Sequence, residues 1–482
     1  MYNKHMKKIV ISKLFLYKHR FMIGYILLAA AFLGLLFAMP VVSPDGLSDA
    51  EMTSAVTSNE LTFDTAIRGN FIDLPYHLLQ KLSINIFGLN AYAIKLPSII
   101  FGIALGLLLI LLLNRWFKNN VAIIASVMTV ISAPFLYIAG SGTPTICLVF
   151  WPTLLLWLGS KIQGEKKPKI SYCFLFALFL LFAIFTPHLI YLAGFIMVFV
   201  LTQPHLRFTV KSLPRKPLIA LAVVSVLAVT FLILSFLRVP DIARQLLWTD
   251  SFSNFFENIR SAFLPFFSWT GNAVSTMLSP MIGIATLSIA LAGLVSTAKG
   301  FFASRNSIAT MLILFTVFIS GLSPNSAVLI ILPLAILISH GIRYILEKWY
   351  GLFPENPYAR VAGFIPIATF IGIILISSMQ YYVFGYRYNL TVANEFQDDL
   401  GLIYQHLEDG TTLLIPKDNA GYDFYKILEG RSTFKVASSL EGIEGPIATL
   451  GRLDAVEKDR KLYRIITSPK SMNSDRIYIY KK

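Results

Sequence analysis

The sequence predicts a polytopic α-helical membrane protein with a small α/β domain outside the membrane. Of its 482 residues, 56% are hydrophobic and only 14% are charged, whereas soluble globular proteins average about 25% charged residues. The apolar residues gather in runs of the length that a membrane-spanning helix needs, about 20 residues. Residues 381–482 instead have a mixed, polar composition. These observations exclude an ordinary soluble enzyme, a disordered chain and a collagen-like chain.

About eleven apolar segments are long enough to cross a membrane. The first is not a cleaved signal, because it is long and no small-residue cleavage pattern follows it. The long apolar stretch from 170 to 203 is divided at Pro187, since proline interrupts a helical hydrogen-bond ladder. The predicted spans are residues 21–40, 92–114, 121–140, 144–160, 170–186, 188–203, 217–237, 278–297, 306–322, 325–341 and 361–380.

The distribution of basic residues predicts the orientation of these spans. Of the 41 Lys and Arg residues, 21 lie in the N-terminal tail and in alternate loops that contain only three acids, Glu165, Glu347 and Glu355. Basic loops remain on the cytoplasmic side of membranes. The N-terminus is therefore expected inside and the C-terminus outside. The formal charge of +15 follows from this asymmetry, and we do not expect a nucleic-acid partner.

Three outside segments are longer than simple connections, which makes them functional candidates. They are the first outside loop, residues 41–91, a second loop, residues 238–277, and the C-terminal domain, residues 381–482; residues 1–380 form the transmembrane domain. In the C-terminal domain we expect a helix over 394–407 and strands over 411–416, 432–436, 462–466 and 476–480. No catalytic constellation is evident there.

The first outside loop is expected to contain two helices. Ser48 and Glu51 have the spacing of a capping box, so a helix should begin after Ser48. After Pro75, apolar residues recur at helical spacing from Leu78 to Phe87. This pattern predicts an amphipathic helix that lies in the plane of the membrane interface rather than across it.

Several short motifs follow one another in an order typical of one family. Each motif is weak alone, but their order agrees with the topology derived from charge. They are Asp49 after the first span, Asp73-Leu74-Pro75-Tyr76-His77-Leu78-Leu79, Phe87-Gly88, Lys95-Leu96-Pro97-Ser98, Phe101-Gly102, Ser132-Ala133-Pro134-Phe135, Thr186-Pro187, Tyr191, Phe266-Phe267-Ser268-Trp269-Thr270-Gly271-Asn272 and Ser279-Pro280. Residues 20–345 thereby resemble the superfamily C polytopic glycosyltransferases, especially the bacterial branch of aminoarabinose transferases and protein-mannosyltransferase-like proteins.

The resemblance implies transfer of a sugar from a polyprenyl-phosphate-linked donor at the outer face. It assigns Asp49 the part of general base or acceptor-positioning group, with Glu51 as a second acid. Two departures from the family pattern are visible. The family commonly has adjacent Asp and Glu, whereas Ala50 separates the two acids here. Gly140 and Thr145 stand where the family usually has Arg and Asp.

A lipid phosphate requires outward-facing cations, and the loops supply Lys81, Arg68, Arg260 and Arg244. Lys81 matches a family lysine in the interfacial helix. Lys95 is either a further phosphate ligand or a side chain that extends from the end of a span to the membrane surface. Arg260 is alternatively a solvated or headgroup-facing side chain.

An acceptor or sugar pocket is expected around Tyr76, His77, Trp269 and Asn272, of which His77 is alternatively a hydrogen-bonded interfacial histidine. No cofactor follows with certainty from the sequence. A divalent metal is left open, although the two cysteines, Cys147 and Cys173, have no metal-binding spacing.

The sequence therefore predicts a multi-pass glycosyltransferase of a bacterial plasma membrane, transferring a hexose or pentose. Its expected partners are a polyprenyl-phosphate sugar lipid and a lipid, glycan or protein acceptor. A lipid or glycan transporter or flippase is the first alternative, but no predicted span contains an acid and no internal repeat is evident, which weighs against a proton-coupled transporter. An inactive scaffold of the same fold is the second alternative, suggested by Gly140 and Thr145.

Overall fold

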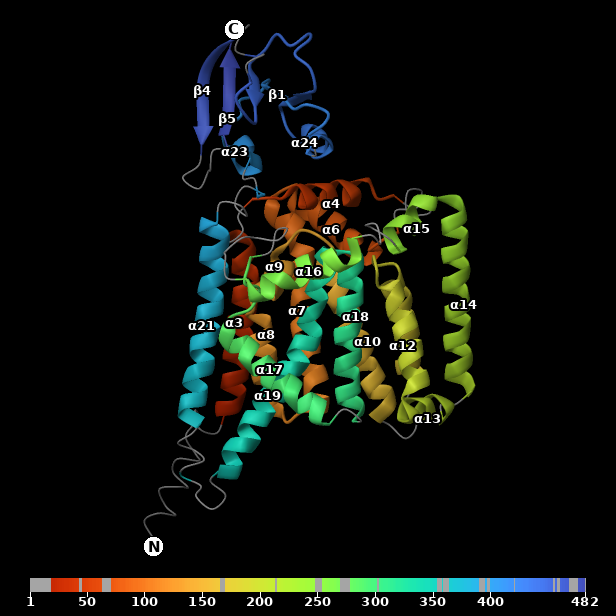
Figure 1. Ribbon diagram of the computed structural model, residues 1–482. Coiled ribbons are helices and arrows are strands. Elements are labelled where there is room, and N and C mark those ends of the chain that lie inside the picture. The colour runs from red at the N-terminus through yellow and green to blue at the C-terminus, as the bar shows by residue number, and fades with distance from the viewer. Residues whose placement is uncertain are drawn as a thin grey trace.

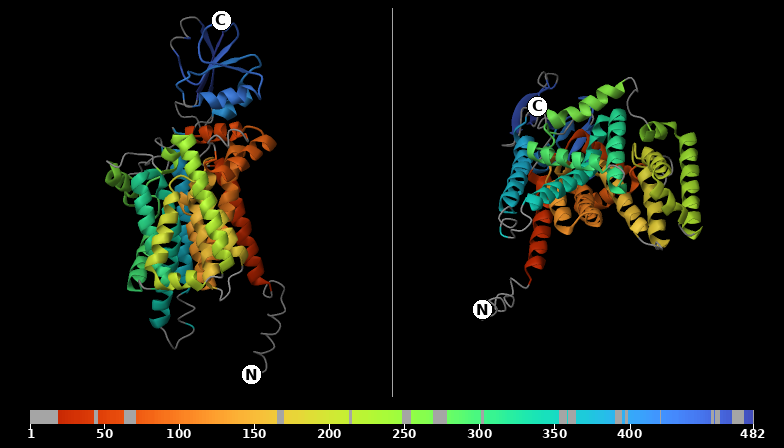
Figure 2. Two further views of the ribbon diagram at one scale, coloured as in Figure 1. Left: turned by 90° about the vertical axis from the view of Figure 1, so that its right-hand side faces the viewer. Right: turned by 60° about the horizontal axis from the view of Figure 1, so that its bottom comes forward.

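Figure 1 shows the computed structural model of the chain, a helical bundle with a small α/β region at one end. The structure describes residues 19–42, 46–62, 71–164, 170–212, 215–247, 254–268, 278–300, 303–352, 358, 364–389, 395–396, 399–419, 421–453, 456, 460–467 and 476–481. The Arg20 end of the first described helix and the C-terminal sheet lie at opposite ends of the bundle (Figures 1 and 2).

The helices and strands follow the predicted segments closely. The helical part consists of α3 (Arg20–Val42), α4 (Asp49–Glu60), α6 (Leu74–Phe87), α7 (Ala91–Trp116), α8 (Asn119–Val130), α9 (Ala133–Gly140), α10 (Thr145–Gly164), α11 (Ile170–Ile184), α12 (Ile190–Thr202), α13 (Pro204–Ser212), α14 (Arg215–Arg238), α15 (Pro240–Leu247), α16 (Phe255–Phe267), α17 (Ile284–Lys299), α18 (Ser304–Leu322), η2 (Pro324–Ile330), α19 (Ile331–Leu352) and α21 (Phe364–Tyr388). The C-terminal region consists of α23 (Asp399–His406), β1 (Thr412–Leu414), α24 (Tyr422–Glu429), β2 (Lys435–Ala437), β3 (Ile447–Thr449), β4 (Lys461–Thr467) and β5 (Arg476–Lys481).

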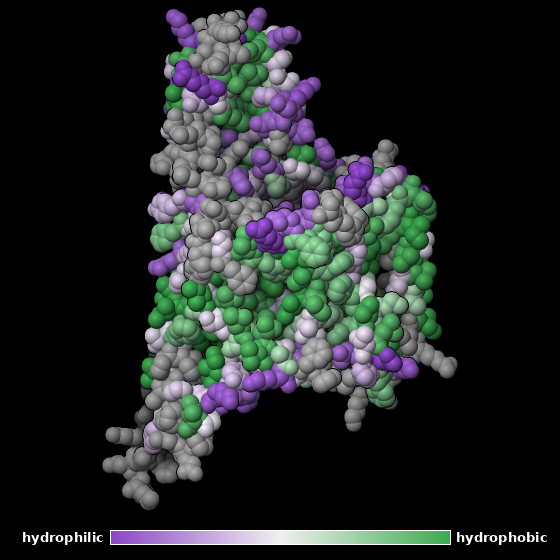
Figure 3. Space-filling model, viewed as in Figure 1, coloured by the Kyte–Doolittle hydropathy of each residue, from purple (hydrophilic) through white to green (hydrophobic). Residues whose placement is uncertain are grey.

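Among the described residues, six helices are long and apolar enough to cross a membrane. A seventh span arises if α8 and α9, which meet at an angle of 64°, are counted as one. The remaining predicted spans coincide with the shorter apolar helices α11, α12 and α17 and with the apolar part of α14. Every predicted span thus corresponds to a helix or a bent pair, while the number of crossings stays a prediction. On the face shown in Figure 3, hydrophobic side chains form a broad band across the bundle.

The first outside loop forms a layer across the end of the bundle that faces the C-terminal region (Figure 1). Its two helices, α4 and α6, begin as predicted, and α4 has the complete capping box of Ser48 and Glu51. In α6 the apolar side chains of Leu78, Leu82 and Ile86 are more than half exposed, whereas polar His77 and Gln80 are buried. This inverted pattern is typical of a helix whose apolar face meets lipid.

The C-terminal region contains a mixed five-stranded sheet in the order β2-β1-β3-β5-β4. β1 pairs in parallel with β2 and β3, and β5 pairs antiparallel with β3 and β4. Four of its strands overlap the predicted ones, whereas β3 and α24 were not predicted. α21 continues to Tyr388, so the helical bundle extends past the predicted boundary at residue 380.

The C-terminal region packs directly on α4. One hydrophobic cluster joins Met52 and Ala55 of α4 to Phe424 and Tyr425 of α24. Arg431 fixes the same junction, because its guanidinium donates to the carbonyl oxygen of Ile84 at 3.3 Å and to Asn59 Oδ1 at 2.9 Å. α4 therefore lies between the sheet region and α6.

The closest helix crossing in the bundle joins α17 to α19 through two glycines. A Cβ added at Gly293 would lie 1.9 Å from the carbonyl oxygen of Leu337, and one at Gly341 would lie 2.0 Å from that of Ile289. Only hydrogen fits at either position. Small residues of this kind allow helix backbones to approach closely in membranes.

We expect Gly293→Ala to destabilise the bundle by about 1–3 kcal/mol, because α17 and α19 would have to move apart. Gly372→Ala is the matched control, since a Cβ on Gly372 of α21 would meet nothing within 4 Å. Thermal unfolding in detergent measures both. Equal melting temperatures for the two variants would contradict this account of the crossing.

Candidate functional site

The most buried acid of the α4–α6 layer is Glu51. Its side chain is completely buried, and each carboxylate oxygen accepts a backbone hydrogen bond. Oε2 accepts from Ser48 N at 2.9 Å, and Oε1 accepts from Gly142 N at 2.6 Å. A carboxylate in the first turn of a helix is also favoured by the helix dipole. Both carboxylate oxygens of Glu51 thus accept hydrogen bonds from backbone N–H groups.

Gly142, between α9 and α10, is held on both sides of its backbone. Its N–H donates to Glu51, and its carbonyl oxygen accepts from Gln80 Nε2 at 2.8 Å. A Cβ on Gly142 would lie 2.7 Å from Ile94 Cγ2 and 3.3 Å from Glu51 Cγ. We call Glu51, Gln80 and Gly142 the Gly142 clamp. It connects α4, α6 and the loop that contains the departure from the family pattern.

A buried polar network extends the clamp along α4 and α6. Ser54 and Ser58 both donate to Gln80 Oε1, at 2.9 Å and 2.6 Å, and Gln80 Nε2 also donates to the carbonyl oxygen of Ile94 at 2.9 Å. Ser58 Oγ lies 2.7 Å from His77 Nδ1. Because the Ser58 proton is used on Gln80, His77 Nδ1–H is the donor of this pair.

His77 is therefore buried and hydrogen-bonded. Burial lowers its pKa to about 4, so its ring is neutral at physiological pH. Tyr76 is also completely buried, and its hydroxyl lies 2.9 Å from Ser98 Oγ. The sequence analysis did not identify Gln80. The spacing of Ser54 and Ser58, and of His77 and Gln80, could have indicated it, because residues three or four apart lie on the same face of a helix.

Asp49 differs from Glu51 in being exposed. It is the first residue of α4, directly after the cap. Glu395, in the segment that leads to the C-terminal region, lies close enough to interact with it. The pKa of Glu395 is raised by burial and, to a smaller degree, by the negative charge of Asp49. Of the two acids at the start of α4, Asp49 is thus the exposed one and Glu51 the buried one.

The predicted phosphate ligands have different surroundings. Lys81 Nζ donates to the carbonyl oxygens of Asn59 and Leu61, so it satisfies the C-terminal end of α4. Arg260 on α16 is exposed and forms an ion pair of 3.4 Å with Glu257. Arg244 on α15 is exposed. The structure does not bring Arg244 and Arg260 into contact with Lys81. Arg68, Trp269 and Asn272 lie outside the described residues.

Lys95 does not extend to the surface, because only 1% of it is exposed. Its ammonium lies 5.9 Å from the ring centre of Phe396, which contacts Tyr386 edge-on. Tyr386 stacks on Tyr137 with ring centres 5.7 Å apart. Gly140 faces the same cluster, since a Cβ there would lie 3.7 Å from the hydroxyl of Tyr382. Pro40 and the hydroxyl of Tyr382 therefore lie beside the position where the family usually has Arg.

Asp73 is an acid that the sequence analysis noted but did not place in the site. It is buried, has the left-handed φ of 49°, and accepts from Thr186 Oγ1 at 2.7 Å. Burial raises its pKa from 3.8 to about 7, partly offset by the Thr186 hydrogen bond. The Asp73-Leu74-Pro75 and Thr186-Pro187 motifs, distant in sequence, therefore meet in the fold.

Within the described part of the chain, no group of three His, Cys, Asp or Glu side chains could hold a metal ion. In the α4–α6 layer, Glu51 accepts from backbone N–H groups and Asp73 from a threonine hydroxyl.

We expect Gly142→Ala to destabilise the protein by about 1–3 kcal/mol, because the new methyl group would overlap Ile94 and press on Glu51. Gly140→Ala is the matched control: its Cβ would make ordinary contacts, at 3.5 Å or more. Thermal unfolding in detergent distinguishes the two variants. If Gly142→Ala melts at the same temperature as Gly140→Ala, the clamp does not limit stability.

Asp73 should make stability depend on pH. Its pKa is higher in the folded protein than in the unfolded chain, so the free energy of unfolding falls as pH rises from about 4 to about 7 and is level above that. A shift of this size corresponds to at most about 4 kcal/mol. Asp73→Asn should remove this loss and leave the protein more stable than wild type at pH 8. The measurement is the melting temperature of both proteins from pH 5 to pH 8.

Asp423→Asn, a change of an exposed acid on α24, is the control for a general effect of charge. Parallel pH profiles for wild type and Asp73→Asn would show that Asp73 does not titrate in this range.

Comparison with known proteins identifies the fold. A family model described as dolichyl-phosphate-mannose-protein mannosyltransferase matches residues 75–234. A comparison with curated protein sequences gives no match. The structure of ArnT from Cupriavidus metallidurans bound to undecaprenyl phosphate is similar, with a TM-score of 0.53 and 14% identity over 95% of this chain and 98% of that one.

A second similar structure is the archaeal oligosaccharyltransferase AglB from Archaeoglobus fulgidus, in complex with an inhibitory peptide and a dolichol-phosphate. Its TM-score is 0.52, with 13% identity over 92% of this chain and 70% of that one. Both alignments extend well beyond the family match and include most of the helical bundle. The chain therefore has the fold of the superfamily C polytopic glycosyltransferases, as its sequence motifs indicate.

Proposed function

We propose that this protein is a membrane glycosyltransferase that moves a hexose or pentose from a polyprenyl-phosphate donor to an acceptor at the α4–α6 layer. The observation that carries the proposal is the difference in surroundings between two acids that lie two residues apart at the start of α4. Glu51 is immobilised by two backbone N–H groups, whereas Asp49 is exposed at the start of the same helix. A rigid support beside a free carboxylate suits general base catalysis.

The proposed step is a displacement at the anomeric carbon of the sugar. Asp49 accepts the proton of the acceptor hydroxyl, whose oxygen attacks the anomeric carbon. The bond from that carbon to the phosphate oxygen breaks, and its electron pair remains on the lipid phosphate. Glu51 acts as a positioning residue, because it holds the beginning of α4 and both of its carboxylate oxygens accept hydrogen bonds from backbone N–H groups.

The layer also suits a donor that remains in the membrane. The exposed apolar face of α6 would lie in lipid, and cations at the same end of the bundle would attract the phosphate. Arg244 is exposed. We propose it as a ligand of the phosphate, together with Lys81, Arg68 and Arg260. The similar ArnT and AglB structures contain undecaprenyl phosphate and dolichol-phosphate, which supports a lipid-phosphate substrate here. We infer that the α4–α6 layer faces outward, because the basic loops lie at the opposite end of the spans and basic loops remain on the cytoplasmic side.

We expect Asp49→Asn to lower turnover about 100-fold or more with a polyprenyl-phosphate sugar, since a general base contributes this much. Its melting temperature should stay near that of wild type, because Asp49 is exposed. Glu51→Gln should lower both turnover and melting temperature, as an amide cannot accept from both N–H groups. Glu347→Gln, a change of an exposed acid on α19, is the control.

Unchanged turnover of Asp49→Asn would contradict the proposed role of Asp49 as general base. If wild type transfers no sugar from polyprenyl-phosphate donors with any of several sugars, the transporter or scaffold interpretation replaces the enzymatic one.

A further inference from the structure

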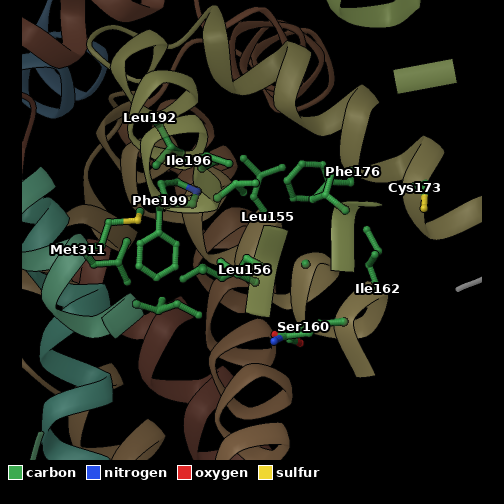
Figure 4. Close-up of a pocket in the computed structure, with 18 of the residues that line it drawn as sticks. Leu155, Leu156, Ser160, Ile162, Cys173, Phe176, Leu192, Ile196, Phe199 and Met311 are labelled. Atoms are coloured by element: carbon green, nitrogen blue, oxygen red, sulfur yellow. The ribbon is translucent and has the colours of Figure 1, made fainter. Parts of the chain in front are cut away.

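A cavity of about 260 Å³ lies far from the α4–α6 layer. Residues of α7, α10, α11, α12, α13 and α18 line it. Leu155, Leu156, Phe176, Ile196 and Phe199 point into it (Figure 4). Its walls are almost entirely hydrocarbon. α13 and the C-terminal end of α10 place it near the end of the bundle opposite the C-terminal region (Figure 1).

The helix surfaces beside the cavity are also apolar. Phe174 on α11 and Met197 and Leu201 on α12 are at least half exposed. In a membrane this surface faces hydrocarbon, so an acyl chain can reach the cavity without crossing water. An apolar cavity that opens to water would instead require a soluble ligand.

Cations surround the lower rim of the cavity. Arg115 donates from its guanidinium to the carbonyl oxygen of Ser160, a residue of the cavity wall, at 3.1 Å. Lys161 is the next residue, and its ammonium lies 5.7 Å from the ring centre of Trp157. Arg207 and Lys211 are exposed on α13, whose Leu206 and Val210 line the cavity.

The described helices that form this rim contain no acid: α7, α10, α13 and α18 have none. Glu165 follows α10 together with Lys166, Lys167 and Lys169, outside the described residues. The rim is thus strongly positive, and Figure 3 shows hydrophilic side chains along this lower edge of the hydrophobic band. An anionic phospholipid matches both features, because its headgroup would meet the positive rim and its acyl chain would fill the apolar cavity.

We propose that this cavity binds an acyl chain of an anionic phospholipid whose phosphate lies among Arg115, Lys161, Arg207 and Lys211. The site is separate from the proposed transfer site, because the α4–α6 layer is at the opposite end of the bundle (Figure 1). A zwitterionic phospholipid would fill the cavity equally well but gain less from the rim. The lipid would lie between α13, α10 and α18, which line the cavity.

The test is native mass spectrometry of the full-length protein in detergent. It compares the binding of phosphatidylglycerol and phosphatidylcholine that carry identical acyl chains. Wild type should bind phosphatidylglycerol more tightly. The double variant Arg115→Gln/Lys161→Gln should lose about fivefold in affinity for each cation removed, with little change for phosphatidylcholine. Its matched control is Lys299→Gln/Lys348→Gln, since both lysines lie over Tyr344 on another part of the same end.

A second variant tests the cavity itself. Gly159 lines it, and a Cβ there would lie 3.9 Å from Phe176 Cε2, an ordinary contact. Gly159→Leu should therefore fold, fill the cavity and weaken both phospholipids by about fourfold per methylene excluded. Gly194→Leu is the control, because a Cβ there meets nothing within 4 Å and Gly194 does not line the cavity.

Three results would overturn the proposal. Equal affinity of wild type for the two phospholipids would show that the rim does not select an anionic headgroup. Unchanged binding to Gly159→Leu would show that the acyl chain does not occupy the cavity. Displacement of phosphatidylglycerol by undecaprenyl phosphate, lost in Gly159→Leu, would assign the cavity to the donor's isoprenoid chain. Because each readout is binding, none depends on whether the protein transfers sugar.

Discussion

The carboxylate of Glu51 is buried in the α4–α6 layer, and the arrangement of that layer depends on it. A buried carboxylate is costly unless hydrogen bonds replace water, and here Ser48 N and Gly142 N replace it. The same two bonds fix where α4 begins and where the loop between α9 and α10 lies. Since α24 packs on α4, the position of the C-terminal region follows from this one side chain as well.

The layer has its polar side turned inward, which a membrane environment explains. Ser54, Ser58, His77 and Gln80 satisfy one another between α4 and α6, so that α6 can present leucine and isoleucine outward. In water this helix would expose apolar area at a cost of about 25 cal/mol per Å². In lipid the cost disappears. The exposed Asp49 then stands at the edge between an apolar surface and a polar, hydrogen-bonded support.

Much of this fold could be predicted from sequence because lipid imposes simple rules. Every predicted span became a helix or a bent pair, and Ser48 with Glu51 identified the start of α4, since such signals are local. The Gly142 clamp could not be predicted, because Glu51 and Gly142 are far apart in sequence and meet only after folding. The pairing of Asp73 with Thr186 was missed for the same reason, although both motifs were noted. β3 and α24 were missed because short elements carry little periodicity.

The departure at Gly140 has a physical explanation in the same region. Gly140 leaves room beside Tyr382, and the neighbouring tyrosines and Lys95 occupy the surroundings. Gly142, two residues on, must be glycine because Ile94 and Glu51 leave no room for a methyl group. The sequence of this loop therefore reflects packing against α4 and α7.

The central claim is that the α4–α6 layer, supported by Glu51, is where a lipid phosphate meets the protein. The most direct test is an experimental structure of the protein in a lipid nanodisc with undecaprenyl phosphate. The account predicts that the phosphate lies at the α4–α6 end, beside the exposed face of Asp49 and within reach of a basic side chain of the outer loops. A phosphate bound only at the α13 end, or a layer in which Glu51 does not contact Gly142, would contradict it.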